Sequence, residues 1–204
     1  MTRRNYVCVD PPHTVQITDR LIGLNGAFHA DLNARINSPA SQAVYRNRGG
    51  VLPRPDPAVN AEDIEPGYEH VGGNWSIRSA IGSHMEPYLT LVVYRVDYDG
   101  LSIVFATDTK PCKPPIALAK GADILVVTCW DHQDVVDRDD VTKAMSGTIN
   151  VARMAHDTGV EKLVLTHFCS GFTTPNSLDR ASREIAEIYS GEVIFGEELM
   201  ALDV

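Results

Sequence analysis

The amino-acid sequence predicts an α/β fold, in which a layer of strands packs against helices. Three observations favour this class. From residue 76 onward, short apolar runs of strand length alternate with stretches of helical periodicity. Turn residues such as Gly and Asp separate these elements. The hydrophobic content of 44% is enough to form a core, which excludes a wholly disordered chain.

The first third of the chain has a different character. Residues 1–75 are rich in Pro and Gly, and helical alternation is visible only over residues 14–36. The stretch 37–70 is too long for an ordinary connection, and we expect a long surface excursion there. The sequence therefore predicts a loop- and helix-containing segment over 1–75, followed by an α/β part over 76–204.

Strands and helices alternate through the second part. The motif Tyr98-Asp99-Gly100 is typical of a tight turn, which predicts an antiparallel hairpin between the strands on either side. Gly121 and Gly159 each follow a helical stretch, where a glycine favours termination. The predicted strands are 76–83, 89–97, 101–107, 124–128, 163–166 and 192–195, and the predicted helices are 114–120, 139–157 and 178–189.

Composition argues against several classes of function. Lys and Arg number 18 against 27 Asp and Glu, and the net charge of −9 disfavours a nucleic-acid partner. No apolar run is long enough to cross a membrane, and the N-terminus lacks the apolar stretch of a secretory signal. The four cysteines show no CxxC spacing, which predicts a protein of the reducing cytoplasm; they are Cys8, Cys112, Cys129 and Cys169.

Three residues of types that bind metals follow predicted strands, namely His84, Asp108 and His167. A rigid strand fixes the direction of the residue beyond its end, and imidazole and carboxylate groups are ligands of zinc and similar ions. Taken singly, each residue is more typical of an ordinary histidine or of an aspartate in a turn. Their recurrence at three strand ends favours a metal site, and a carboxylate between two histidines suits a binuclear centre.

His132 is a further candidate. It follows the strand 124–128 at the same predicted edge of the sheet, and we take it as a candidate catalytic residue together with Asp108. The alternative is a solvent-exposed loop histidine with no role. Cys112 and Cys169 lie close in sequence to two of the candidate ligands, but a small, partly buried cysteine is their ordinary role.

Several short motifs occur in a fixed order: Ser83-His84, Tyr94-Arg95-Val96-Asp97, Phe105-Ala106-Thr107-Asp108-Thr109, and the segments 118–125, 159–168 and 191–200. Together they resemble the C-terminal half of the metallo-β-lactamase-fold hydrolases, in their ribonuclease Z and arylsulfatase-like branch. The resemblance implies half of an αβ/βα sandwich, with a mixed sheet and flanking helices. It also implies that His84 binds one metal, that His167 binds the other, and that Asp108 bridges the two.

Two departures from the family pattern affect the interpretation. The family's His-x-His-x-Asp-His motif, which supplies four further ligands, is missing, and residues 27–32 keep only two of its four positions. Met145 stands where the family often carries a histidine that acts as a proton donor. A half-sandwich also exposes an apolar sheet face. We therefore expect the missing half on a second polypeptide, in a heteromeric complex.

The resulting hypothesis is a subunit of a metal-dependent hydrolase. A metal-bound hydroxide would attack an ester, lactone, amide or phosphodiester of a small molecule. The expected cofactor is Zn²⁺, two ions per complete site, with iron or manganese as alternatives. Two other functions stay open at this point: a non-catalytic binding or regulatory remnant of the fold, and a metal-dependent oxidase on the same scaffold.

Overall fold

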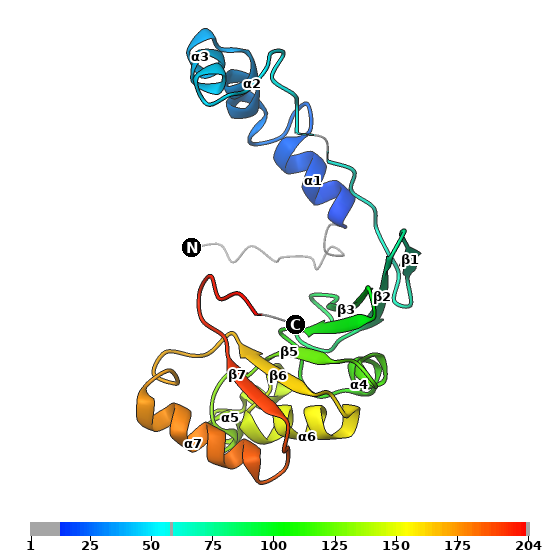
Figure 1. Ribbon diagram of the computed structural model, residues 1–204, viewed down its shortest axis with the longest axis vertical. Coiled ribbons are helices and arrows are strands. Elements are labelled where there is room, and N and C mark those ends of the chain that lie inside the picture. Colours follow the sequence, from blue (N-terminus) through cyan, green and yellow to red (C-terminus); the bar gives the residue numbers. More distant parts are fainter. Residues whose placement is uncertain (1–12, 58, 203–204) are drawn as a thin grey trace, which may run out of the picture. The chain divides into compact units, whose positions relative to one another are not determined.

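The computed structural model describes residues 13–57 and 59–202. Contacts between residues divide the chain into two compact units, Met1–Ile64 and Glu65–Val204, which we call the N-terminal and the C-terminal unit (Figure 1). The boundary expected after residue 75 stays a prediction. Cys8 lies outside the described residues. None of the helices in the described part is long and apolar enough to span a bilayer.

The described residues of the N-terminal unit form three helices of nine residues each. The single helix predicted over 14–36 is two helices, because the glycine-containing turn 23–28 interrupts it. Gly23 stands directly after the first helix, and its backbone N–H donates to the oxygen of Asp19. The helices are α1 Thr14–Ile22, α2 His29–Asn37 and α3 Pro39–Asn47.

Helix α3 corrects the excursion predicted over 37–70. The Ser38 hydroxyl accepts a hydrogen bond from the backbone N–H of Ser41 at 3.3 Å, which caps the helix. Pro39 occupies the first helical position, where a missing N–H removes no helical bond. The Ser-Pro start signal therefore begins a helix inside the stretch that the sequence predicts as an excursion.

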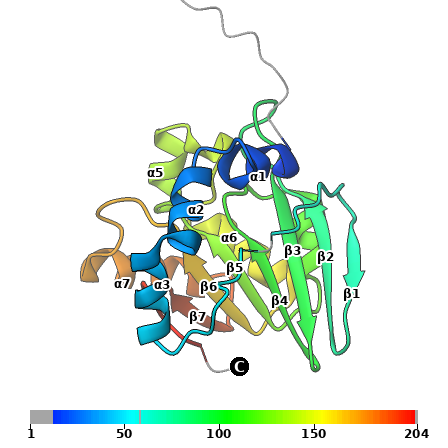
Figure 2. The same cartoon turned by 90° about the horizontal axis from the view of Figure 1, so that it is seen from above.

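A mixed sheet forms the C-terminal unit. Among the described residues it has seven strands, which lie in the order of the sequence (Figure 2). Strands β1 to β4 are antiparallel neighbours, and β4 to β7 are parallel neighbours. This confirms the predicted α/β class with a mixed sheet. The strands are β1 Glu69–Val71, β2 Trp75–Ile81, β3 Val92–Tyr98, β4 Leu101–Ala106, β5 Ile124–Thr128, β6 Lys162–Thr166 and β7 Glu192–Phe195.

The predicted hairpin is present between β3 and β4. Tyr98 pairs with Leu101, and Asp99 and Gly100 connect them with φ angles of 49° and 88°. Positive φ at both central residues is the requirement of the two-residue turn whose twist matches that of the strands. The Asp-Gly dipeptide therefore predicts this connection correctly.

Helices connect the parallel strands. The helix predicted over 139–157 is wrong in its first half, since η1 and a loop with the buried Ser146 precede α6. Gly159 ends α6 with a φ of 70°, as predicted. The elements are α4 Lys113–Ala119, α5 Gln133–Arg138, the 3₁₀ helix η1 Val141–Lys143, α6 Thr148–Thr158 and α7 Pro175–Ala186.

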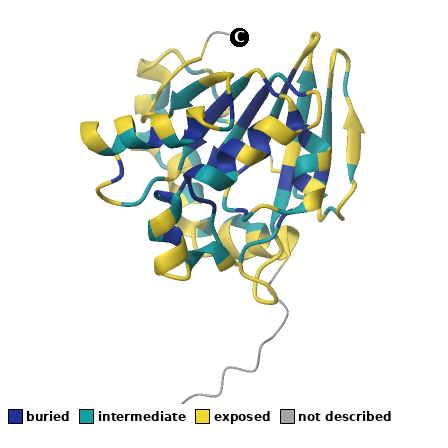
Figure 3. Cartoon of the chain, turned by 90° about the horizontal axis from the view of Figure 1, so that it is seen from below, coloured by how far each residue is buried: buried dark blue, intermediate teal, exposed yellow. Residues whose placement is uncertain are grey.

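The helices of the C-terminal unit lie over one face of the sheet (Figure 3). Leu125 and Leu165 of the central strands and Ile185 of α7 are fully buried in the core between them. The opposite face of the hairpin carries Tyr94 and Phe105, which are cross-strand partners and are exposed. The carboxyl ends of the parallel strands β4, β5 and β6 meet at one edge of this sheet.

Candidate metal centre

Asp108 and His167 meet at the carboxyl edge of the parallel strands. Asp108 follows β4 and His167 follows β6, on either side of β5. Oδ1 of Asp108 lies 3.4 Å from Nδ1 of His167, and both side chains are about half exposed, at 40% and 47%. Both residues have left-handed backbones, with φ of 55° and 57°. Non-glycine residues adopt this conformation rarely, and it turns the chain sharply where each strand stops.

Thr128, the last residue of β5, holds the carboxylate in place. The backbone N–H of Asp108 donates to Oγ1 of Thr128 at 2.7 Å. The same hydroxyl approaches Oδ1 of Asp108 at 3.5 Å. Thr128 is fully buried, so the strand between the two candidate ligands provides a rigid support for one of them.

Trp130 packs beside the other candidate ligand. Its ring centroid lies 5.7 Å from that of His167, with the rings inclined by 42°. The backbone N–H of Cys169 donates to the oxygen of Trp130 at 2.9 Å, and that of Trp130 donates to Ser146 at 2.9 Å. The loop after β5 is therefore fastened to the loop that carries His167.

His84 follows β2 in a loop that is fastened to the Asp108 loop. The N–H of Ser83 donates to Oγ1 of Thr109 at 3.0 Å, and the N–H of Lys110 donates to the oxygen of Ser83 at 2.9 Å. Nδ1 of His84 lies 3.0 Å from the carbonyl oxygen of Ala144. A carbonyl only accepts, so Nδ1 carries the proton and Nε2 of the neutral ring keeps its lone pair for a metal.

The donor set fits part of a zinc site. Two donor atoms at about 2.0–2.1 Å from a tetrahedral zinc lie about 3.3 Å apart, and the atoms of Asp108 and His167 are 3.4 Å apart. Within residues 13–57 and 59–202, no group of three or more His, Cys, Asp or Glu side chains is close enough to hold a metal. The structure therefore brings together two of the three predicted ligands, and His84 stands apart from this pair.

His132 is buried rather than solvent-exposed. It is only 5% exposed and precedes α5. Its Nδ1 lies 3.1 Å from Oε2 of Glu184, and its Nε2 lies 2.9 Å from Oγ of Ser177. The alternative of an exposed loop histidine is thus wrong. A ring with both nitrogens bonded inside the protein is placed to connect α5 with α7, and its catalytic role stays a prediction.

The cysteine thiols near the edge are protonated. Sγ of Cys169 donates to Oδ2 of Asp131 at 3.0 Å. Burial, and then this bond to Asp131, raise the pKa of Cys169 to about 11. Burial also raises the pKa of Cys129 far above its usual range.

Known proteins resemble this chain over most of its length. A family model described as a beta-lactamase superfamily domain matches residues 29–168. A ribonuclease Z of Streptomyces avermitilis is 34% identical over 109 residues, which are 52% of this chain and about a third (34%) of that protein. A ribonuclease Z of Mycobacterium tuberculosis strain H37Rv is 28% identical over 209 residues, which cover 96% of this chain and 68% of that protein.

Solved structures support the fold. The metallo-beta-lactamase fold protein YhfI from Bacillus subtilis aligns with a TM-score of 0.56 at 21% identity, over 67% of this chain and 52% of that one. Zn²⁺-bound PqqB from Methylobacterium extorquens aligns with a TM-score of 0.54 at 17% identity, over 81% of this chain and 63% of that one. Both likenesses agree with the mixed sheet and its flanking helices.

The names of these relatives overturn one expectation from the sequence. From the net charge of −9, the sequence predicts a small-molecule substrate and no nucleic-acid partner. The matching relatives are ribonucleases, and this expectation is therefore wrong. The physical reason is that net charge describes the whole surface, whereas nucleic-acid binding depends on local positive charge and bound metal ions.

Proposed function

Because this chain belongs to the beta-lactamase superfamily, we propose that it is a metal-dependent phosphodiesterase that acts on RNA. The chain is a ribonuclease Z-like member of a family of hydrolases with the metallo-β-lactamase fold. The observation that carries the proposal is the pair formed by Asp108 and His167. An imidazole and a carboxylate lie 3.4 Å apart at the edge where the parallel strands end.

Zinc is the proposed metal, and Asp108 and His167 are its proposed ligands. His84 is the third candidate ligand and would bind through Nε2. When bound, zinc acts as a Lewis acid on the phosphoryl group and lowers the pKa of water. We also propose that a complete site would hold two metal ions, with Asp108 as the ligand shared by both. Iron and manganese are the alternative metals.

The chain's own residues orient these groups. Thr128 accepts the backbone N–H of Asp108 at 2.7 Å, which holds the carboxylate at the strand end. The carbonyl of Ala144 holds the proton of His84 on Nδ1, so the free nitrogen is the one available for a metal. The ring of Trp130 limits the rotation of His167 on one side. The side chains of Asp108 and His167 are both about half exposed, so a phosphate can reach them without a rearrangement of the chain.

A cytoplasmic location, a catalytic role for His132 and a second polypeptide that carries the missing motif stay predictions.

The experiment is RNA cleavage with a matched pair of variants. The purified chain is supplied with zinc and incubated with a labelled RNA, and products are separated by gel electrophoresis. We expect cleavage that falls about 100-fold or more in Asp108→Asn, because a metal ligand contributes several kcal/mol to the transition state. Asp157→Asn is the control, since this exposed carboxylate pairs with His156 at the far end of α6. Equal cleavage by both variants, or none by the native chain, contradicts the proposal.

A further inference from the structure

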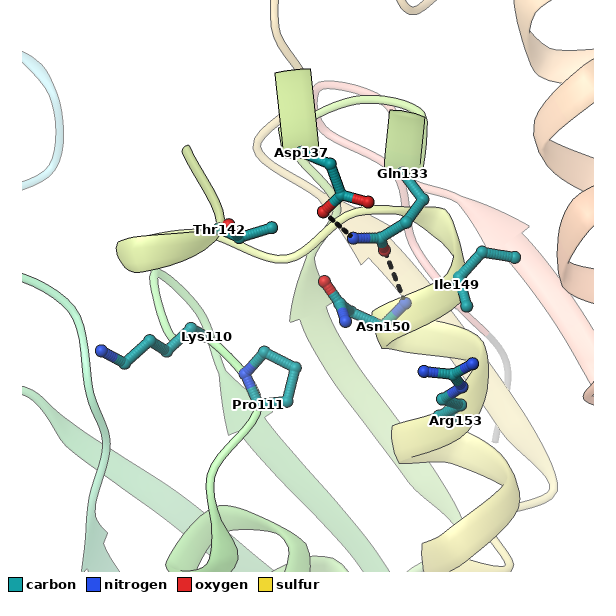
Figure 4. A pocket seen from close by; sticks show the side chains of 8 residues that line it. All are labelled: Lys110, Pro111, Gln133, Asp137, Thr142, Ile149, Asn150 and Arg153. Atoms are coloured by element: carbon teal, nitrogen blue, oxygen red, sulfur yellow. Dashed lines mark hydrogen bonds between the residues drawn. The ribbon is translucent and has the colours of Figure 1, made fainter. Parts of the chain in front are cut away.

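A polar cavity lies in the C-terminal unit. Its volume is about 550 Å³, and it opens between η1, α5, α6 and the loop after β4 (Figure 4). Lys110 and Arg153 lie on opposite sides of it, and Asn150 lies between them in this view. Thr142, Gln133 and Asp137 complete its polar lining.

The lining of this cavity contains two cationic side chains and one carboxylate. Among the described residues, neither Lys110 nor Arg153 has an ion-pair partner within 4.0 Å or a side-chain hydrogen bond. Outside the lining, the pKa of Glu86 is lowered by a hydrogen bond from Ser83 and also by the charge of Lys110. The single acidic group of the lining, Asp137, accepts a hydrogen bond from Nε2 of Gln133 at 3.0 Å. The lining therefore has an excess of positive charge, in a chain whose net charge is −9.

An oriented amide adds a donor to these cations. Oδ1 of Asn150 accepts the backbone N–H of Gly147 at 3.3 Å, and Oε1 of Gln133 accepts the backbone N–H of Asn150 at 3.1 Å. These bonds fix both amide groups, so Nδ2 of Asn150 is left as a donor. A cation on each side with an amide donor between them suits an anion with several acceptor oxygens.

The cavity shares its loops with the candidate metal centre. Lys110 comes two residues after Asp108 and is bonded through its N–H to Ser83, the neighbour of His84. Ser146, between η1 and α6, donates to the oxygen of Thr109 at 2.9 Å. The same loops therefore position the proposed ligands and one wall of the cavity.

We propose that this cavity binds a backbone phosphate of the RNA substrate, at a nucleotide other than the one cleaved. Phosphate contacts of this kind position a nucleic acid without reading its sequence. The inference rests on the proposed action on RNA and assigns a separate subsite to it.

The test is RNA binding without metal. Fluorescence anisotropy of a fluorescein-labelled single-stranded RNA of about 20 nucleotides is measured in EDTA over a range of salt concentrations. The variant is Lys110→Gln/Arg153→Gln. Its matched control is Lys120→Gln/Arg183→Gln, which removes the same charge from exposed positions outside the cavity. Inorganic phosphate is added as competitor in a second series.

We expect the cavity variant to bind RNA about tenfold more weakly than the control. The slope of its binding constant against salt, both on logarithmic scales, falls by about 0.7 for each phosphate that the variant no longer neutralises. Competition by inorganic phosphate in the native chain and not in the cavity variant would also support the subsite. Equal affinity of the two variants overturns the inference, as does the absence of RNA binding by the native chain. Failure of the proposed function gives a different result from failure of this inference. In that case the native chain binds RNA through the cavity but does not cleave it when zinc is added.

Discussion

Replacing Glu184 by Ala tests how strongly a buried polar network joins the helices of the C-terminal unit. Oε2 of Glu184 on α7 accepts hydrogen bonds from Oγ1 of Thr148 at 2.5 Å and from Nδ1 of His132 at 3.1 Å. Its Oε1 accepts from Nε of Arg180 at 2.7 Å. The residues Thr148 and His132 are 0% and 5% exposed, so water does not replace the lost carboxylate easily.

The expected cost is about 3–5 kcal/mol. A buried donor that loses its partner costs about 1–3 kcal/mol, and Glu184→Ala leaves two such donors, on Thr148 and His132. Two such donors give about 2–6 kcal/mol, and the 23% exposure of the Glu184 side chain argues against the upper end of this range. For a domain of this size, the loss corresponds to about 6–20 °C in Tm.

Urea unfolding followed by tryptophan fluorescence measures this loss. Both tryptophans, Trp75 and Trp130, belong to the C-terminal unit, so the signal reports on the unit that contains Glu184. Glu187→Ala is the control, because this residue is exposed at the end of α7. A loss below about 1 kcal/mol in Glu184→Ala would refute the assignment of the network as a main source of stability.

Acid adds a second signature of the same network. Burial alone raises the pKa of Glu184, but hydrogen bonds from Thr148, His132 and Arg180 outweigh it and hold the pKa below its usual range. A carboxyl group with a lowered pKa stabilises the fold above its ordinary pKa, and this contribution disappears as the pH falls through the lowered value. The stability difference between the native chain and Glu184→Ala is therefore largest near neutral pH and narrows below about pH 4.

Three further predictions concern other parts of the C-terminal unit. Thr128→Val removes the hydroxyl that supports the Asp108 loop, and we expect the zinc affinity measured by calorimetric titration to fall about 10- to 100-fold. The control Thr158→Val breaks a hydrogen bond within α6 and leaves the zinc affinity unchanged. The raised pKa of Cys169, about 11, predicts slow alkylation by iodoacetamide at neutral pH. Asp131→Asn lowers that pKa and speeds the reaction, and equal rates by mass spectrometry would contradict this cause. Gly159→Ala places a Cβ at a φ of 70° and is expected to cost about 1 kcal/mol in urea unfolding; an unchanged midpoint would contradict it.

The central parallel strands β5 and β6 were predictable because most of their residues are buried on both faces. The strand at 124–128 has the predicted bounds, since a continuous apolar run between turn residues is typical of a buried strand. The strand at 192–195 also has the predicted bounds, although it is only partly buried. Helix α5 was not predictable. Its six residues show too little periodicity, and its start depends on the Thr148 hydroxyl, which accepts the backbone N–H of Gln133 at 3.0 Å.

The meeting of Asp108 and His167 was predictable, and the hydrogen bonds around them were not. Asp108 and His167 each follow a predicted strand of the same sheet, and the structure places them 3.4 Å apart, on either side of β5. The support from Thr128 and the carbonyl of Ala144 depends on hydrogen bonds that span 20 and 60 residues of sequence. Such bonds are set by how the loops pack, and no local pattern encodes them.

Zinc titration of the purified chain tests the central claim most directly. Isothermal titration calorimetry compares the native chain with Asp108→Asn/His167→Ala and with the control Asp157→Asn/His156→Ala, which removes an exposed pair of the same chemistry with a separation of 3.1 Å. If the edge of β4 and β6 is a metal centre, the native chain and the control bind zinc with equal affinity, and the edge variant binds at least about tenfold more weakly. Equal zinc binding by all three proteins, or no binding by the native chain, would contradict the assignment of Asp108 and His167 as metal ligands.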